Sequence, residues 1–273
     1  MINKTKIIAT IGPSTSSKEM LRKIIQRGVN VCRINFSHVS HSEAKEIIDN
    51  IKEVNKQINT HTAILADLQG PKIRVGNFEK PIKLKKGSYI YFNTTQKQPN
   101  DIFISYSNFA KDVKKGDRVL LDDGKLSLLV ENSNGKNRVK LKVVFGGLLK
   151  SNKGVNLPNT DISLPCLTKK DKIDLNFILE QKIEWIGLSF VRSAEDVKKL
   201  KTIIKRHKKS QALVIAKIEK PEAINDIENI ILASDAIMVA RGDLGVEVPA
   251  FRVPAYQKMI VSKSVNNAKP VII

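Results

Sequence analysis

The chain has 273 residues, of which 41% are hydrophobic and 27% are charged, a composition that can bury a sizeable core and excludes a disordered chain. Its formal net charge is +20. No run of about 18 apolar residues occurs, and Met1 leads into a polar segment, so we expect neither a membrane span nor a signal peptide. We therefore predict a soluble, cytoplasmic protein without membrane partners. The two cysteines, Cys32 and Cys166, stand far apart without a CxxC spacing, which argues against a disulfide framework or a zinc site.

The basic charge points to a rival class of function, because a strongly basic surface attracts nucleic acid or anionic lipid. The lysines are spread along the whole chain, however, and the densest run, KKLKTIIKRHKK, keeps helical spacing. Leu200, Ile203 and Ile204 would form the buried stripe of that helix and leave its lysines in solvent. We therefore do not expect nucleic acid as a partner. A basic nucleic-acid- or anion-binding remnant that has lost catalysis stays the alternative function.

Apolar runs rich in β-branched residues alternate with helical patterns from the start of the chain. A strand, a helix and a second strand are predicted within residues 6–36. Ser16 is expected as the N-cap of this helix, with Glu19 closing a capping box, and Gly28 suits the position after the last helical turn.

The same alternation continues and, after a gap, resumes. The further predicted segments are a helix around 44–51, a strand over 62–68, a helix opened by Thr168 and Asp171, a strand over 184–190, a helix opened by Ser193 and Asp196, a strand over 212–219, a helix from Pro221 through Ile224, Ile227 and Ile231, a strand over 236–242 and the start of another over 270–273. Strand-then-helix repetition implies a parallel sheet, either open or closed as a barrel.

The helical period disappears between 75 and 157, where β-type runs replace it. The dipeptides Asp123-Gly124, Asn134-Gly135 and Gly146-Gly147 separate these runs and are each expected at a hairpin. Their close spacing predicts a small antiparallel barrel or sandwich, inserted into the β/α series.

The first strand-to-helix loop, TIGPST, contains one glycine, so it carries neither the dinucleotide fingerprint nor the phosphate loop of open nucleotide-binding sheets. We therefore predict an α/β fold: a TIM-type (β/α)8 barrel, incomplete at its C-terminal end, with about six complete strands and the start of another. Residues 1–74 would form the first part of the barrel, 75–157 an inserted β-rich lid domain, and 158–273 the continuation of the barrel.

Polar side chains gather where the predicted barrel strands end. In barrel enzymes the active site is assembled at this rim from several strands, so the clustering is a functional signal beyond any one residue. The side chains concerned are Arg33, Asn35, Ser37, Asp67, Arg74, Ser189, Lys217, Glu219, Arg241 and Asp243.

The segment IAKIEKPE carries the sharpest signal, because strand alternation points Lys217 and Glu219 to the same side. This pair could be a structural salt bridge, since buried charges need a partner. Asp243, expected in a Gly-flanked turn, adds a second carboxylate, and two carboxylates completed by water and phosphate oxygens suit Mg²⁺. The Arg-Gly-Asp tripeptide could also indicate cell adhesion, but we do not favour this because it directly follows a buried-type strand.

Together these groups would form an electrostatic clamp. Arg33 and Arg74 would meet phosphate oxygens, and Lys217 would meet charge at the transferring group. Phosphoryl transfer needs mainly positioning and charge stabilisation, so this arrangement is typical of a phosphotransferase.

A series of blocks along the whole chain resembles pyruvate kinase segments, in the order of that family: KIIATIGPST, VCRINFSHVSH, DLQGPKIRVG, LLDDGKLSL, KGVNLPN, LTKKD, IGLSFVR, AKIEKPEAI and SDAIMVARGDLGVEVP. The resemblance implies a barrel with a lid and transfer of a phosphoryl group from phosphoenolpyruvate to ADP, giving pyruvate and ATP in the last step of glycolysis. It implies Mg²⁺ or Mn²⁺ as cofactor and a homotetramer for the full-length protein. A different barrel enzyme that handles phosphoenolpyruvate is a further alternative.

The resemblance also implies roles for single residues. Lys217 looks like the transition-state lysine and Arg33 like the phosphate-binding arginine, and both would be catalytic. Glu219 and Asp243 look like the magnesium ligands. The substrate-binding set would be Arg33, Lys217, Gly242, Asp243 and Ser189.

Two further sets follow from the same resemblance. The nucleotide-binding set would be Asn35, His38, Arg74, Lys153 and Asp123. In it, Lys153 would contact the nucleotide from the lid, and Asp123 would help the lid to close. Asn35, Ser37 and Asp67 would line a pocket for a monovalent cation.

One departure from the family concerns that cation. Most potassium-dependent members have Thr-Lys-Gly-Pro-Glu after the aspartate, whereas this chain has Leu68, Gln69, Gly70, Pro71 and Lys72. A fixed ammonium can replace a mobile cation, so we predict that Lys72 supplies the charge and that K⁺ is not required.

The other departure is length. Family members run further than PVII, through a threonine-bearing loop, an eighth strand and a C-terminal domain. We therefore expect a fragment of a longer protein, with an eroded gene product as the alternative. Little activity is expected of the chain alone, because an unclosed barrel exposes strand edges.

Overall fold

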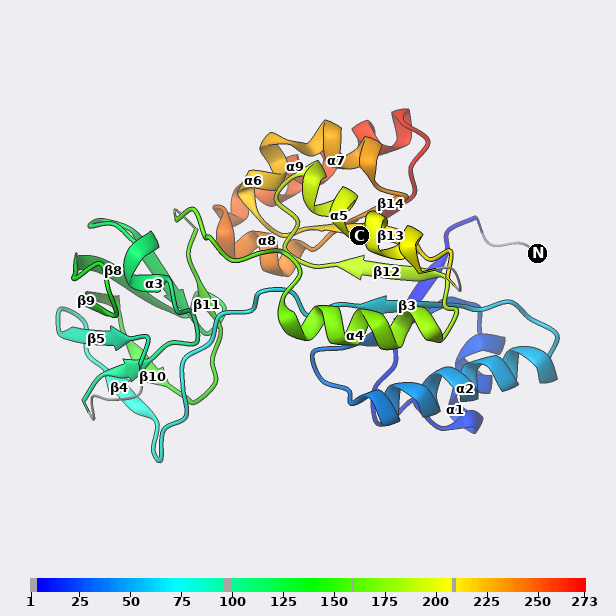
Figure 1. Cartoon of the computed structure of the whole chain (residues 1–273), viewed down its shortest axis with the longest axis horizontal. Helices are drawn as coiled ribbons and strands as arrows, with labels where there is room; N and C mark the ends of the chain where they lie inside the picture. The colour runs from blue at the N-terminus through cyan, green and yellow to red at the C-terminus, as the bar shows by residue number, and fades with distance from the viewer. Residues whose placement is uncertain (1–3, 96–99, 159, 208–209) are drawn as a thin grey trace.

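The computed structural model describes residues 4–95, 100–158, 160–207 and 210–273. A curled parallel sheet flanked by helices forms the larger part of the molecule, and a smaller, mostly antiparallel β unit lies to one side of it (Figure 1).

The larger sheet is the barrel part of the fold. In the described residues it has seven parallel strands, in the order β1 (Ile7–Thr10), β2 (Val29–Asn35), β3 (Ala63–Asp67), β12 (Trp185–Leu188), β13 (Leu213–Ile218), β14 (Ala236–Val239) and β15 (Val271–Ile272). The order follows the chain, and β3 pairs directly with β12 across the inserted segment. Because β1 and β15 are the outer strands, the sheet is an unclosed barrel, and this confirms the predicted fold class.

Helices cover the outer face of this sheet. They are α1 (Lys18–Gln26), α2 (His41–Gln57), α4 (Lys169–Glu180), α5 (Ala194–Arg206), α6 (Pro221–Asn225), α7 (Ile227–Ala233) and α9 (Val253–Asn266). Their apolar stripes pack onto the strands, as Leu21, Ile48 and Leu200 illustrate, all fully buried in one core. The helix α8 (Arg241–Glu247) follows β14 at the rim and packs against α9, with a 3-10 turn at Ala250–Arg252 between them. On α5, Ile204 is also buried and Ile203 is partly buried, while Lys198, Lys199 and Lys205 are exposed, as the spacing predicted. Lys201 instead pairs with Asp235, and Lys208 and Lys209 of the predicted run lie outside the described residues.

Two predicted helix starts behave differently. Thr168 caps α4 in a reciprocal capping box with Asp171, as predicted. For α1 the prediction is wrong by one residue, because Ser17 is the N-cap and accepts a hydrogen bond from the Met20 amide. Glu19 is therefore too close to close a box, and its carboxylate binds Lys23 one turn further along instead.

The helical segment after Pro221 also departs from the prediction. A single helix was expected, but the structure breaks it at Asp226 into α6 and α7. The Asp226 carboxylate accepts hydrogen bonds from the Ala194 amide at the start of α5 and from Asn229, so its side chain ties two helix starts together.

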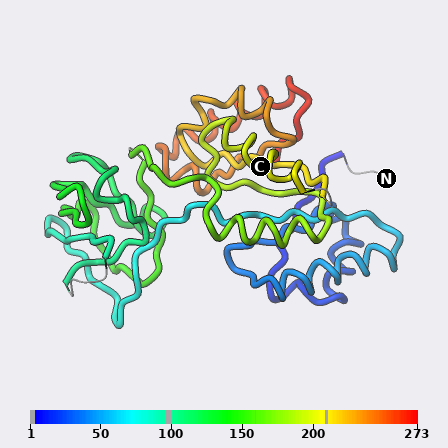
Figure 2. Tube along the Cα trace, in the orientation of Figure 1, coloured from blue at the N-terminus to red at the C-terminus, as the bar shows by residue number. Residues whose placement is uncertain are grey.

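The inserted unit has its own sheet and core. Its described strands form a six-stranded sheet of β11 (Val155–Asn156), β7 (Arg118–Leu121), β8 (Leu126–Ser133), β9 (Arg138–Phe145), β5 (Tyr89–Asn93) and β6 (Ile102–Phe103), with the pair β4 (Ile82–Leu84) and β10 (Gly147–Leu149) and the short helix α3 (Phe109–Asp112) beside it. Phe92, Phe109 and Leu141 are fully buried in its core. Figure 2 traces the two connections that join it to the barrel, one after β3 and one before α4.

Two of the three predicted hairpin turns are confirmed. Asp123-Gly124 joins β7 to β8, and Asn134-Gly135 joins β8 to β9. Gly146-Gly147 is not a hairpin, because the chain passes from β9 into β10, which pairs with β4. A β-carbon on Gly146 would lie 2.3 Å from the Leu84 carbonyl oxygen, so glycine is required here by a close backbone crossing.

In the described part of the chain, no helix has the length and apolar character needed to cross a membrane. Cys32 and Cys166 are both buried free thiols. Burial raises the pKa of the Cys32 thiol to about 11, which makes it unreactive at neutral pH.

Candidate active site

A buried lysine lies at the centre of the site. Lys217 is the next-to-last residue of β13, and its ammonium Nζ lies 2.9 Å from Glu219 Oε1, 2.9 Å from Ser189 Oγ and 3.1 Å from Asp67 Oδ1. Lys217 is 8% exposed and Glu219 1% exposed. The prediction that strand alternation points Lys217 and Glu219 to one side is thus confirmed, and the pair gains partners from β3 and from the end of β12.

The charges in this cluster depend on one another. Burial lowers the pKa of Lys217, but the carboxylates of Glu219 and Asp67 outweigh burial, so the pKa is raised and the ammonium stays charged. Burial raises the pKa of Glu219, Lys217 lowers it in part, and Asp243 raises it, with a net upward shift. A cation bound beside Glu219 would favour its ionised form and so oppose this upward shift of its pKa.

Asp67 is the second acidic group of the cluster. It ends β3 and is 2% exposed. Its Oδ2 accepts a hydrogen bond from Arg33 Nε at 2.8 Å, and Arg33 Nη1 donates to Thr10 Oγ1 at 2.8 Å. Arg33 and Asp67 come from the paired strands β2 and β3. The register sets Arg33 opposite Leu65 and Asn35 opposite Asp67, so the long Arg33 side chain reaches along the sheet face to Asp67 at the carboxyl end.

The end of β12 adds a strained backbone to the site. Ser189 is 2% exposed and donates to the Leu68 carbonyl at 2.7 Å. Phe190 follows it with a positive φ of 55°, a conformation that is rare outside glycine. In this conformation the Phe190 amide donates to Glu219 Oε2 at 2.9 Å. The strain is offset by this bond, which holds the second oxygen of Glu219 in place.

Asp243 contributes a second carboxylate from α8. It was expected in a turn, and that detail is wrong: the segment from Arg241 is helical, so Asp243 lies in the first helical turn and Gly242 directly precedes it. The reason is that the Leu244 amide donates back to the Ala240 carbonyl as soon as β14 ends. Asp243 is exposed, and its charge raises the pKa of Glu219, which places the two carboxylates within electrostatic reach.

These carboxylates fit a hard divalent cation. Among the described residues, no group of three or more His, Cys, Asp or Glu side chains is arranged to hold a metal ion unaided. Glu219 and Asp243 could supply two oxygen ligands, and Mg²⁺ commonly takes one or two carboxylates and completes its ligand set with water and substrate oxygens.

The end of β2 and the loop after it hold three further predicted residues. Asn35 ends β2 opposite Asp67, and its side-chain oxygen accepts a hydrogen bond from the Ser37 amide at 3.0 Å. His38 is exposed, and its amide donates to the Asn35 carbonyl. Asn35 and Asp67 thus lie on one edge with the Lys217 cluster, whereas His38 faces solvent.

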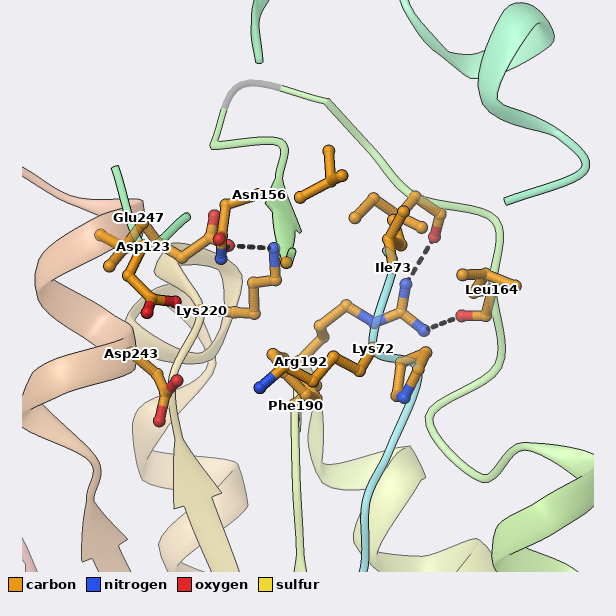
Figure 3. A pocket seen from close by; sticks show the side chains of 15 residues that line it. Lys72, Ile73, Asp123, Asn156, Leu164, Phe190, Arg192, Lys220, Asp243 and Glu247 are labelled. Atoms are coloured by element: carbon orange, nitrogen blue, oxygen red, sulfur yellow. Dashed lines mark hydrogen bonds and ion pairs between the residues drawn. The ribbon is translucent and has the colours of Figure 1, made fainter. Parts of the chain in front are cut away.

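Four predicted residues lie at the base of the lid. Arg74 bridges to Gly154 in the returning chain, and its guanidinium donates to the Asn152 carbonyl at 3.0 Å. Lys153 pairs with Asp122 at 2.7 Å. Asp123 and Lys72 line the cleft between lid and barrel, together with Asp243 (Figure 3). The structure thus brings lid residues and the candidate metal ligand to one cavity.

Sequence reasoning missed a second buried charge cluster in this cleft. Lys220 and Glu247 are each 6% exposed and pair at 2.7 Å, and Asn156 of the lid donates to the same Glu247 oxygen. Lys220 and Glu247 are 27 residues apart in the chain, so no local spacing links them. The available signal was that Glu247 lies one helical turn after Asp243 and hence on its face.

Two supports of the rim were also missed. Arg192 donates to the carbonyls of Ile162 and Leu164, at 2.5 and 2.6 Å, and so holds the chain that returns from the lid. The buried Asp171 carboxylate accepts a hydrogen bond from the Gly70 amide and thereby fixes the loop that leads into the lid.

Comparison with known proteins agrees with this geometry. The profile of the family described as "Pyruvate kinase, barrel domain" matches residues 2–273. The chain belongs to the pyruvate kinase family. It is 45% identical to "Pyruvate kinase 2" of Synechocystis sp. over 98% of its own length and 46% of that protein. It is 42% identical to a pyruvate kinase of Staphylococcus aureus, covering 99% of this chain and 47% of the relative, and 41% identical to one of Clostridium perfringens, covering 100% and 58%.

The chain therefore spans about half the length of these curated pyruvate kinases, and the part it spans is the barrel with its inserted unit. The resemblance drawn from the sequence blocks is confirmed at the level of the family.

Proposed function

We propose that this chain is part of an enzyme that transfers a phosphoryl group from phosphoenolpyruvate to ADP and so forms pyruvate and ATP, the last step of glycolysis. The observation that carries the proposal is the buried Lys217 ammonium, held between Asp67 and Glu219 at the carboxyl end of the strands of a pyruvate kinase barrel.

The residues of the site divide the work. Glu219 and Asp243 would hold Mg²⁺ or Mn²⁺, which when bound neutralises charge on phosphate oxygens. Arg33 would bind the phosphate of phosphoenolpyruvate, and Lys217 would stabilise the negative charge that develops at the transferring group. The positively charged side chains of Arg33 and Lys217 both reach into the site, because each donates a hydrogen bond to the Asp67 carboxylate. Catalysis would therefore need little rearrangement of the barrel.

The neighbouring groups would orient the two substrates. Ser189, within 2.9 Å of Lys217 Nζ, would position the lysine beside phosphoenolpyruvate, and the backbone of Gly242 would contact the same substrate. The nucleotide would be met by Asn35 and His38 on the barrel. Arg74, at the base of the lid, and Lys153 and Asp123 in the lid would also bind the nucleotide. Residues 75–157 would act as the lid domain.

The monovalent cation pocket of Asn35, Ser37 and Asp67 would be served by Lys72. Lys72 is exposed and lines the cleft that the lid closes, so its ammonium is available to the bound substrates (Figure 3). Full activity in buffer free of K⁺ and Na⁺, and a new K⁺ requirement in Lys72→Glu, are the expected results. A strong K⁺ requirement of the unaltered enzyme would contradict this part of the proposal.

The whole protein would be longer than this chain and would act in the cytoplasm as a homotetramer. The chain alone is expected to have little activity, because β1 and β15 leave the barrel unclosed.

The decisive experiment is an assay of the full-length gene product with phosphoenolpyruvate, ADP and Mg²⁺, in which pyruvate is measured by a coupled reduction. Pyruvate should form only when all three are present. Absence of pyruvate, together with tight binding to random DNA that weakens steeply with salt, would favour the basic binding remnant instead.

A further inference from the structure

The cleft between lid and barrel contains a carboxylate that the proposed reaction does not use. Glu247 is the last residue of α8, and its side chain is 1% exposed. Its Oε1 accepts hydrogen bonds from Lys220 Nζ at 2.7 Å and from Asn156 Nδ2 at 2.8 Å (Figure 3).

The three partners come from three separate segments. Lys220 directly follows the candidate metal ligand Glu219, and Glu247 lies one helical turn after the other candidate ligand, Asp243. Asn156 is on β11, in the returning strand of the lid. Glu247, itself on the segment of Asp243, thus joins that segment to the segment of Glu219 and to the lid.

The chemistry of the contact suits reversible docking. Because the lid contributes a neutral amide, its departure would leave Glu247 still paired with Lys220, and no buried charge would lose its counter-charge. Next to this contact, a β-carbon added to Gly124 of the lid would sit 3.7 Å from Val246 Cγ1, so the lid turn rests on α8 without interlocking.

The cluster is also poorly explained as a device for stability alone. In the described structure the second oxygen, Oε2, is buried without a hydrogen-bond partner. A buried polar atom left unsatisfied is costly, and a buried ion pair is often no more stable than apolar residues of the same volume.

We propose that Glu247 is a positioning residue: through Lys220 and α8 it holds Glu219 and Asp243 at a fixed separation, and through Asn156 it fastens the lid above them. The inference rests on the proposed function, because it assigns a use to the lid of that enzyme. Glu247 would thus link closure of the lid over the nucleotide to the positions of the two metal ligands.

The test uses three variants of the full-length protein. Asn156→Leu removes the lid donor at nearly constant volume. The double variant Lys220→Met with Glu247→Gln removes both charges together, so that neither is left buried alone. Glu228→Gln is the matched control, since it neutralises an exposed Glu–Lys pair with Lys263 on the outer helices.

Two readouts do not depend on turnover. Hydrogen exchange follows the amides of Asp122 and Val155, which donate to the carbonyls of Gly154 and Ile73 at the base of the lid. Calorimetric titration with Mn²⁺ alone reports on Glu219 and Asp243. The third readout separates KM for ADP from kcat.

Asn156→Leu should speed exchange at these amides and raise KM for ADP about tenfold, the change expected for loss of one hydrogen bond to a charged group, while Mn²⁺ affinity and kcat stay near the starting values. The double variant should show the same lid changes and also weaken Mn²⁺ binding about tenfold or more. The control should change none of them.

Unchanged exchange and KM in Asn156→Leu would overturn the fastening of the lid, and unchanged Mn²⁺ affinity in the double variant would overturn the positioning of the ligands. If the unaltered protein makes no pyruvate, the proposed function fails, whereas exchange and Mn²⁺ binding still decide whether Glu247 couples lid to metal ligands.

Discussion

The barrel and the lid bury different kinds of residue. Among the described residues, the charged residues that are buried over the whole residue lie in the barrel: Asp67, Asp171, Asp174, Lys217, Lys220, Glu219 and Glu247. The lid buries the Asp101 side chain, which is 2% exposed and pairs with Arg138. The lid core is built from apolar side chains such as Phe92, Val139 and Leu141, and of its polar residues in the cleft Asp123 is exposed and Asn156 is half-buried.

This difference teaches which region carries chemistry. Buried charges persist only where partners from several strands meet them, and the carboxyl ends of parallel strands provide such convergence. An antiparallel sheet with one apolar core provides enclosure instead. The two regions should therefore respond differently to substitution.

The largest effect is expected from Lys217→Met in the barrel. Loss of this ammonium should lower phosphoryl transfer by about 1,000-fold or more, because a preorganised charge at the reacting group is removed. Steady-state assay of the full-length protein measures it. Lys263→Met, which removes a half-buried lysine that pairs with Glu228 on the outer helices, is the control and should retain activity. A loss below tenfold for Lys217→Met would show that the lysine is structural.

A smaller effect is expected from Leu141→Ala in the lid, where the side chain is fully buried. The cavity should destabilise the lid by about 2–5 kcal/mol, measured by urea denaturation with hydrogen exchange of lid amides. Mn²⁺ binding in the barrel should persist, since Glu219 and Asp243 lie outside the lid. Leu148→Ala, at a residue 54% exposed in the same lid, is the control and should change stability by less than about 0.5 kcal/mol. If Leu141→Ala also lost Mn²⁺ binding, the lid and the barrel would not respond independently to substitution.

The junction of the two regions is probed by Gly70→Ala. Gly70 has a φ of +69°, and an added β-carbon would lie 2.7 Å from Phe190 Cδ2 and 3.1 Å from Ser189 Cβ. The expected loss is about 1–3 kcal/mol of unfolding free energy, from backbone strain and overpacking. Gly12→Ala is the matched control, because among the described residues its β-carbon would meet no atom within 4 Å. Equal melting temperatures of the two variants would show that the rim is more pliable than the structure indicates.

The smallest effect concerns pH. The pKa of Glu219 is raised, chiefly by burial. Protons therefore compete with the metal for Glu219 at pH values above those at which an ordinary glutamate titrates. Mn²⁺ affinity should be full above this raised pKa and fall as pH drops through it, by up to about tenfold for each pH unit. Calorimetric titrations across pH measure the slope. Glu219→Gln should bind weakly at every pH and lose the slope, whereas Glu228→Gln should keep it. A flat profile of the unaltered protein would place the metal elsewhere.

Local pattern was enough to predict most elements and part of the site. Helical spacing located α2, α4 and α5, and strand alternation placed Lys217 beside Glu219, because these features repeat within a few residues. The turn dipeptides located two hairpins correctly. Gly146-Gly147 was misread because its glycine is demanded by Leu84, a contact distant in sequence.

The sequence by itself determined a β/α series interrupted by a β-rich unit, and the charged groups that end its strands. Only the tertiary structure decided which charges share a partner: Asp67 between Arg33 and Lys217, and Glu247 between Lys220 and the lid. The physical reason is range. Periodicity reports which face a side chain takes, but the partner of a buried charge is set by the packing of distant segments, where desolvation permits only paired groups.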